Sequence, residues 1–200
     1  MKFILGKKLG MSQIFDKDGN VLPVTIIEAG PCFVTQIKTK EYDGYDAIQI
    51  GCEGINEKKI KKSQKPKPYK WIKEFKVEKD EAAKFKTGDK IDVSIFAEGE
   101  KVKISGISRG KGFQGVVKRH HFKGGPASHG HRHVLRRAGS IGTSFPERVP
   151  KGRRMPGRTG NERVTVKNIK VAAIDLENNL LAIKGAVPGA RGTLLEINTI

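Results

Sequence analysis

The sequence predicts a mainly β fold with short helices, in which a small barrel or sandwich carries a long basic extension. Short apolar runs, alternating or rich in β-branched residues, recur over residues 1–105 and again over 164–200, with turn-forming residues between them. Such spacing is typical of a small closed barrel or a sandwich. The stretch between lacks this pattern. We therefore expect one β core built from both ends of the chain, with residues 106–163 inserted as an extended basic arm.

The N-terminal part is predicted element by element. Residues 13–15 and 21–24 flank the turn-forming segment 16–20, which predicts a hairpin. Its second strand is expected to continue to Glu28 and to stop at Gly30. The remaining elements are expected in this order: a strand at 33–38, a turn at 43–44, strands at 45–52 and 71–77, a short helix at 80–85, and a second hairpin that joins 91–95 to 102–104.

The segment 56–70 contains seven Lys and one Glu. Pro66 and Pro68 exclude a regular helix or a central strand there, and we expect a small inserted region at about 56–90. Two interpretations of the lysines remain open: a solvated surface loop, or a second, weaker loop that contacts phosphates. After the arm, strands are expected at 164–166, 169–176, 180–183 and 192–197.

A net charge of +18 points to a nucleic acid or an anionic membrane as the partner. No window approaches the roughly 20 apolar residues of a spanning helix, and the first residues do not form a secretory signal. Cys32 and Cys52 lack a CxxC spacing and are predicted to be isolated, small buried hydrophobes of a reduced, cytosolic protein. A nucleic acid is therefore the expected partner.

Most of this charge lies in residues 109–163, which hold fourteen Lys and Arg against two carboxylates, with eleven Gly and all five His. Such a stretch cannot bury enough apolar area to offset the entropy lost on ordering. We expect it to order only against a polyanion. The glycines before Val116 also predict a helix start. The chain has no helix-turn-helix, zinc-finger or heptad pattern, so an arm threaded between RNA helices is favoured over a reader of DNA.

The candidate RNA-binding residues are the basic and histidine side chains of this arm. They are Arg109, Lys111, Lys118, Arg119, His120, His121, Lys123, His129, His131, Arg132, His133, Arg136, Arg137, Lys151, Arg153, Arg154, Arg158 and Arg163.

The histidines also permit a metal site, because alternation at 129, 131 and 133 would place three imidazoles on one side of an extended strand. Zinc sites usually add Cys or carboxylate ligands, and the neighbouring Arg side chains repel a cation, so we expect no metal and no cofactor. Catalysis has little support. The carboxylate nearest to the arm's serines is Glu147, and Glu162 is expected to pair with Arg163.

Six segments resemble the bacterial members of the ribosomal protein L3 family, and the resemblance covers essentially the whole chain in order. They are residues 6–15, 24–32, 108–122, 137–142, 157–165 and 180–189.

The resemblance implies a six-stranded closed barrel of the type seen in translation elongation factors. It implies a cytoplasmic ribosomal component, not an enzyme, that binds 23S rRNA near its 3′ end. Such a protein joins early, nucleates assembly, touches neighbouring large-subunit proteins as a monomer and extends an arm toward the peptidyl transferase centre. The tip of that arm would comprise Gly139, Ser140, Ile141, Gly142, Thr143, Ser144 and Phe145. Some members carry a methylated glutamine where this chain has Phe145, so no such methylation is expected.

Two other functions remain as alternatives. A non-ribosomal RNA chaperone would bind any RNA with similar affinity at moderate salt. A zinc-dependent hydrolase that uses the histidine cluster would contain stoichiometric metal.

Overall fold

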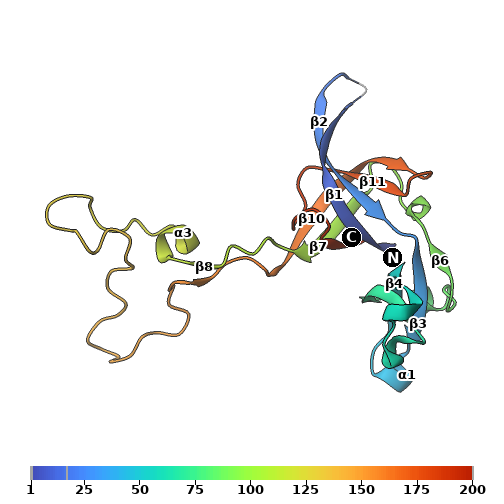
Figure 1. Ribbon diagram of the computed structural model, residues 1–200, viewed down its shortest axis with the longest axis horizontal. Coiled ribbons are helices and arrows are strands. Elements are labelled where there is room, and N and C mark those ends of the chain that lie inside the picture. Colours follow the sequence, from blue (N-terminus) through green and yellow to red (C-terminus); the bar gives the residue numbers. More distant parts are fainter. Residues whose placement is uncertain (1, 17, 200) are drawn as a thin grey trace. The chain divides into compact units, whose positions relative to one another are not determined.

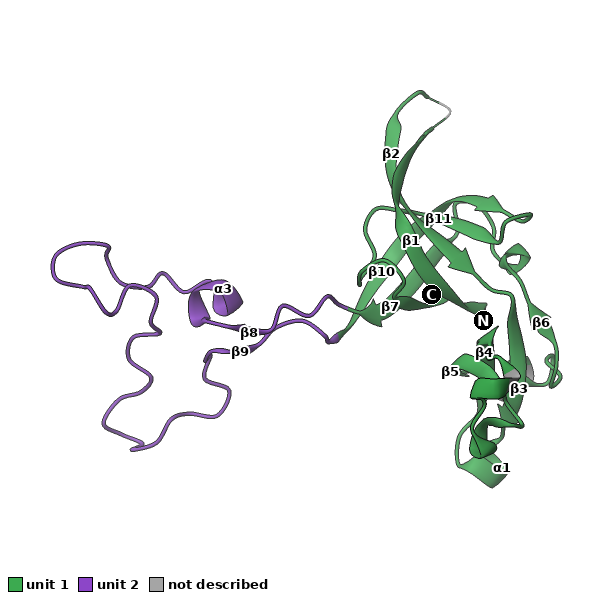
Figure 2. Ribbon diagram, viewed as in Figure 1, with its two compact units in different colours: residues 1–107, 163–200 green, residues 108–162 purple. Residues whose placement is uncertain are grey.

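The computed structural model describes residues 2–16 and 18–199. The chain divides into two compact units, residues 1–107 with 163–200 (unit 1) and residues 108–162 (unit 2) (Figure 2). Unit 2 falls within the stretch predicted as the arm. The fold is mainly β with a few short helices, as predicted.

Six antiparallel strands form the main sheet of unit 1 (Figure 1). Their order is β1-β12-β7-β10-β11-β2, and β2 pairs again with β1, so that the sheet closes on itself as a barrel. Their bounds are β1 Phe3–Phe15, β2 Val21–Ala29, β7 Lys101–Ile107, β10 Arg163–Asp175, β11 Leu180–Lys184 and β12 Leu194–Thr199. Closure leaves these strands without a free edge.

A second sheet of four strands has the order β5-β4-β3-β6. Its strands are β3 Cys32–Lys38, β4 Ala47–Gly54, β5 Tyr69–Lys76 and β6 Lys90–Ile91, and the helices beside them are α1 Lys40–Asp43 and α2 Lys79–Ala82. One hydrophobic cluster spans both sheets, and the ring of Phe3 on β1 stacks on that of Phe75 on β5 with centroids 4.8 Å apart. Unit 1 therefore has a single core.

The first predicted hairpin is confirmed: β1 pairs with β2, and Phe15 lies opposite Val21. Of its predicted turn, Lys17 lies outside the described residues. The strands expected at 33–38, 45–52, 71–77, 180–183 and 192–197 are also present with shifted ends. Those expected at 164–166 and 169–176 form one strand, β10, whose register with β7 shifts between Val166 and Ile169.

The second predicted hairpin is wrong. β6 pairs with β3, and residues 93–95 form the short 3-10 helix η3 (Val93–Ile95). β7 instead pairs with β10 and β12, and the Gly99 amide just before it donates to the Val171 carbonyl at 2.8 Å. Ile91 and Val93 are buried, but they reach the core from two short elements rather than from one strand.

The prediction that the two cysteines are isolated is wrong. Cys32 on β3 and Cys52 on β4 are direct cross-strand partners, with Cys32 buried and Cys52 half-buried. Their thiols interact, which raises the pKa of Cys32 and lowers the pKa of Cys52. Sequence spacing does not reveal this pair, because the strands that carry the two residues meet only through the pairing of β3 with β4.

Candidate nucleic-acid interface

Unit 2 begins with a ladder formed by the two ends of the arm. The short strands β8 (Phe113–Gln114) and β9 (Gly157–Arg158) lie side by side (Figure 2). At the first and last residues of unit 2, the Ser108 amide donates to the Glu162 carbonyl at 2.9 Å. A Cβ at Gly160 would lie 2.0 Å from the Arg109 carbonyl oxygen, and the φ of Gly160 is +75°. Glycine is therefore required for the two chains to approach this closely.

A short helix follows β8. α3 (Val116–His120) begins after Gly115, as predicted, and ends at His121, which has left-handed backbone angles. Arg119 Nη1 donates to the Met155 carbonyl at 2.9 Å, and His120 Nε2 lies 3.1 Å from the same oxygen. The helix is thus tied to the returning half of the arm.

Unit 2 has almost no core of its own. Of residues 108–162, all of which the structure describes, Val116 is the one buried hydrophobic side chain. Seven large apolar side chains are exposed instead: Phe113, Val134, Leu135, Ile141, Phe145, Val149 and Met155. This segment cannot be held in shape by burial of its own apolar surface.

The predicted tip of the arm is held by local hydrogen bonds. Ser140 Oγ donates to the Gly142 carbonyl at 2.8 Å, and Thr143 Oγ1 donates to the Phe145 carbonyl at 2.7 Å. Arg153 Nη2 donates to the Ser140 carbonyl at 2.6 Å and so joins the two sides of the tip. The Phe145 side chain is 87% exposed. The tip therefore offers an apolar ring and polar backbone without burying either.

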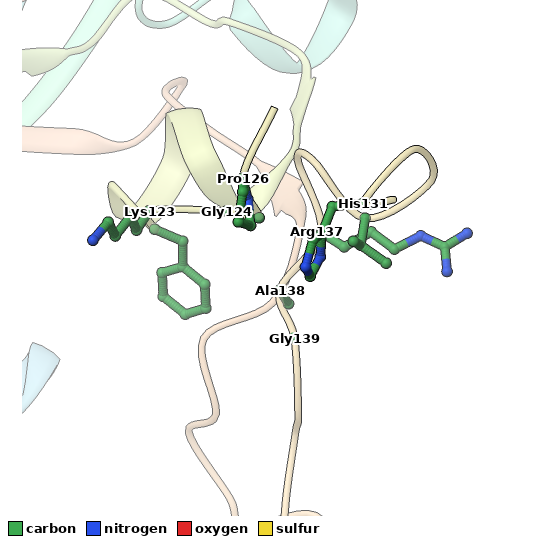
Figure 3. Close-up of a pocket in the computed structure, with 10 residues that line it drawn as sticks. Lys123, Gly124, Pro126, His131, Arg137, Ala138 and Gly139 are labelled. Carbon is green, nitrogen blue, oxygen red and sulfur yellow. The ribbon is translucent and has the colours of Figure 1, made fainter. Parts of the chain in front are cut away.

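A cavity of about 860 Å³ lies within the arm (Figure 3). We call it the arm cavity. One wall carries Lys123 and Pro126, and the other carries His131, Arg137 and Ala138. The complete lining is Phe122, Lys123, Gly124, Gly125, Pro126, His131, Val134, Arg137, Ala138 and Gly139.

Sixteen of the eighteen predicted RNA-binding side chains are exposed, and Arg119 and His120 are half-buried. Within the described residues, no Lys or Arg of unit 2 forms an ion pair with a carboxylate. The cations of unit 2 are therefore available to an anionic partner. Arg119 and His120 hold the helix to Met155, so their first role is to position the arm.

Arg163 departs from the prediction. It is the first residue of β10, in unit 1, and its guanidinium donates to the Glu196 carboxylate on β12. The expected pair of Arg163 with Glu162 does not form. Glu162 instead ties the base of the arm together, because its backbone amide donates to Ser108 Oγ at 3.3 Å.

The histidines do not lie on an extended strand. Residues 129–130 and 132–133 form turns, with φ of +57° at His129, so the alternation at 129, 131 and 133 does not place three imidazoles on one side of a strand. Across the described chain, no cluster of three or more His, Cys, Asp or Glu side chains could hold a metal ion. In the same part of the chain, no helix is long and apolar enough to cross a membrane.

Sequence reasoning missed two residues of this interface. Arg148 is exposed in the arm and belongs with the predicted cations. Phe122 lines the arm cavity. Its signal was present in the sequence, since an aromatic residue among Lys118, Arg119, His120, His121 and Lys123 matches the interleaving of aromatic and basic residues common in RNA-binding proteins.

The lysine loop (residues 56–70) is built from the short 3-10 helices η1 (Glu57–Lys59) and η2 (Lys62–Gln64). Two of its lysines are engaged: Lys67 bonds to the amide oxygens of Gln36 and Gln49, and Lys70 bonds to Glu53 at 2.6 Å. The other five are exposed: Lys58, Lys59, Lys61, Lys62 and Lys65. The loop thus combines fixed anchors with exposed cations.

Comparison with known proteins shows the family of the chain. A sequence profile of the ribosomal protein L3 family matches residues 72–179. The chain is 52% identical to "Large ribosomal subunit protein uL3" of Thermosipho africanus, over 100% of this chain and 98% of the relative. It is 51% identical to the protein of that name from Carboxydothermus hydrogenoformans (98% of this chain, 96% of the relative). It is 52% identical to the one from Petrotoga mobilis (98% and 94%). The resemblance seen in the sequence is confirmed, and the chain belongs to the ribosomal protein L3 family.

Proposed function

We propose that this protein binds 23S rRNA near its 3′ end, nucleates assembly of the large subunit and extends residues 106–163 toward the peptidyl transferase centre. As a member of its family it is a structural ribosomal constituent and not an enzyme. We place it in the cytoplasmic ribosome, as a monomer beside neighbouring large-subunit proteins. The barrel, of the type seen in translation elongation factors, is the folded anchor in this proposal.

One observation carries the proposal: unit 2 holds thirteen Lys and Arg against two carboxylates, pairs none of them internally, and buries one hydrophobic side chain. A polyanion neutralises this charge and supplies the contacts that the arm lacks. The exposed Lys and Arg would contact phosphates, and the exposed histidines would contact bases or 2′-hydroxyls. The tip, residues 139–145, would lie closest to the peptidyl transferase centre.

The test is sedimentation of the large subunit through a sucrose gradient after a high-salt wash. Phosphate contacts weaken steeply with salt, so a protein bound only by its surface charge should leave. An arm enclosed by RNA should hold the protein at about one copy per subunit. Complete release would overturn the proposal and favour the chaperone, whose affinity should be similar for any RNA.

A further inference from the structure

We propose that the arm cavity binds one unstacked nucleotide of an RNA strand, with its base against the ring of Phe122 and its phosphate near the cations of the rim. This inference rests on the proposed function and deepens it. It names the kind of RNA element that the arm recognises, which is a base outside a helix.

The first support is the placement of the aromatic ring. Phe122 is half-buried and lines the cavity. Its ring centroid lies 6.1 Å from that of His120, with the planes tilted by 46°, and His120 is itself held at the Met155 carbonyl. The ring is therefore positioned by neighbours that are fixed to the other half of the arm. Aromatic rings held in this way are the usual platforms for unstacked bases.

The second support is that the cavity walls are joined by backbone contacts. The Gly125 amide donates to the Leu135 carbonyl at 3.0 Å. At Gly124, where φ is +77°, a Cβ would lie 2.2 Å from the same oxygen. The two walls thus meet at a distance that only glycine permits, and the cavity exists without a ligand to shape it.

The third support is the chemistry of the lining. Pro126, Val134 and Ala138 give an apolar surface, while Lys123, His131 and Arg137 bring cationic or titratable nitrogen atoms. No carboxylate is among the lining residues. A nucleotide combines a flat apolar face with a phosphate and matches both features, whereas a duplex backbone would make no use of the ring. The volume lies within the range of about 300–1,000 Å³ that is typical of ligand sites.

A free nucleotide would offer the same chemistry as a nucleotide within RNA. The surroundings of the cavity favour RNA, because exposed basic side chains continue along the chain on both sides of its lining segment, at Lys118 before it and at Lys151 after it. Phosphates of the flanking strand could occupy these positions, and a single nucleotide could not.

The experiment compares Phe122→Ala and Phe122→Trp with Phe113→Ala in the full chain. Phe113 is the matched control, since it is an exposed aromatic residue of the same arm that does not line the cavity. Binding to an RNA fragment from the 3′ end of 23S rRNA is measured at several salt concentrations. Phe122→Ala should lower the affinity by roughly 5- to 150-fold, the usual effect of losing one stacked base. The salt dependence should not change, because no phosphate contact is removed.

Two further measurements make the result decisive. Phe122→Trp should keep the wild-type affinity, since it retains a stacking surface, and this variant separates loss of the ring from loss of the arm's shape. Ultraviolet cross-linking of the wild-type complex should join a nucleotide to the peptide that contains Phe122. Equal effects of Phe122→Ala and Phe113→Ala, failure of Trp to preserve binding, or absence of the cross-link would overturn the inference.

Titration with adenosine monophosphate tests the other source of the ligand. Binding that requires Phe122 but does not compete with RNA would assign the cavity to a free nucleotide and overturn the RNA assignment. The proposed function fails separately, when the wild-type protein leaves the subunit in high salt. If the wild-type protein stays on the subunit and Phe122→Ala binds RNA with normal affinity, the inference about the arm cavity is overturned and the proposed function stands.

Discussion

Arg163 shows why the partner of a single side chain is difficult to predict from sequence. Glu162 is its neighbour in the chain, but it lies in a bend before β10, and its backbone is bonded to Ser108. Glu196 comes within reach because β10 and β12 both pair with β7. No residue near Arg163 signals this arrangement. The charge of the arm could be predicted from composition, whereas this ion pair depends on the register of three strands.

Two glycines of β4 allow a matched test of packing. A Cβ at Gly51 would lie 2.5 Å from the Tyr69 ring, while Gly54 has no atom within 4 Å of the corresponding position. Gly51→Ala should lower the free energy of unfolding by about 1–3 kcal/mol through overpacking. Gly54→Ala should raise it by about 0.4–1 kcal/mol, because alanine restricts the unfolded chain. Denaturant unfolding measures both, and similar effects at the two sites would contradict the packing described here.

Glu53 makes the stability of unit 1 depend on pH. Lys70 and, less strongly, Lys7 lower the pKa of its carboxyl group. A lowered pKa in the folded state stabilises the protein at pH values above the ordinary value of about 4.3, and this contribution disappears as the pH falls through the folded pKa. Glu53→Gln should therefore be less stable than wild type near neutral pH, and the difference should shrink in acid. Melting temperatures across this range test the prediction. Lys70→Gln removes the main partner of Glu53 and should show the same dependence on pH, and a pH-independent difference from wild type in both variants would contradict it.

At the scale of elements, the two hairpins mark the limit of sequence-based prediction. The β1–β2 hairpin was predictable because its turn, at 16–20, lies between the strands that it joins. The hairpin expected at 91–104 failed because pairing with β3 and β10 decides that region. The contact of Gly124 and Gly125 with Leu135 could not be predicted either, because none of these residue types indicates a contact about ten residues away.

The lysine loop is the element whose role the sequence left open. If it contacts phosphates, replacing its five exposed lysines by Gln should make RNA affinity less dependent on salt. The slope of the logarithm of the affinity against the logarithm of the salt concentration should become shallower by about 0.7–0.9 for each phosphate that is no longer neutralised. Lys67→Gln is the matched control. It breaks bonds to Gln36 and Gln49 and should reduce stability while leaving the slope nearly unchanged. An unchanged slope in the five-lysine variant would assign these residues to the solvated surface.

At the scale of the whole molecule, the two units differ in what holds them. Unit 1 has one hydrophobic core that spans two sheets, whereas Val116 is the one buried hydrophobic side chain among residues 108–162. This contrast could be predicted from composition, because the arm lacks apolar periodicity. The arm cavity could not be predicted, because it depends on turns and close glycine contacts that the sequence does not specify.

The same contrast predicts how the free protein responds to protease. Trypsin should cleave within residues 108–162 well before it cleaves unit 1, because segments with few buried contacts open at little cost in free energy. In the assembled large subunit the arm should be protected. Mass spectrometry of the fragments locates the cuts, and equal protection of both units in the free protein would contradict the expectation.

Because β12 pairs with β1 and β7, the barrel cannot close until β12 has been synthesised. β12, with its six residues, is synthesised after the other five strands of the barrel, yet it lies between β1 and β7 in the sheet. Until it leaves the exit tunnel, both neighbours expose an unpaired edge, the kind of surface that recruits other chains. The arm is translated before that moment. The nascent protein therefore presents its basic arm while its barrel is still open, and β12 closes the barrel.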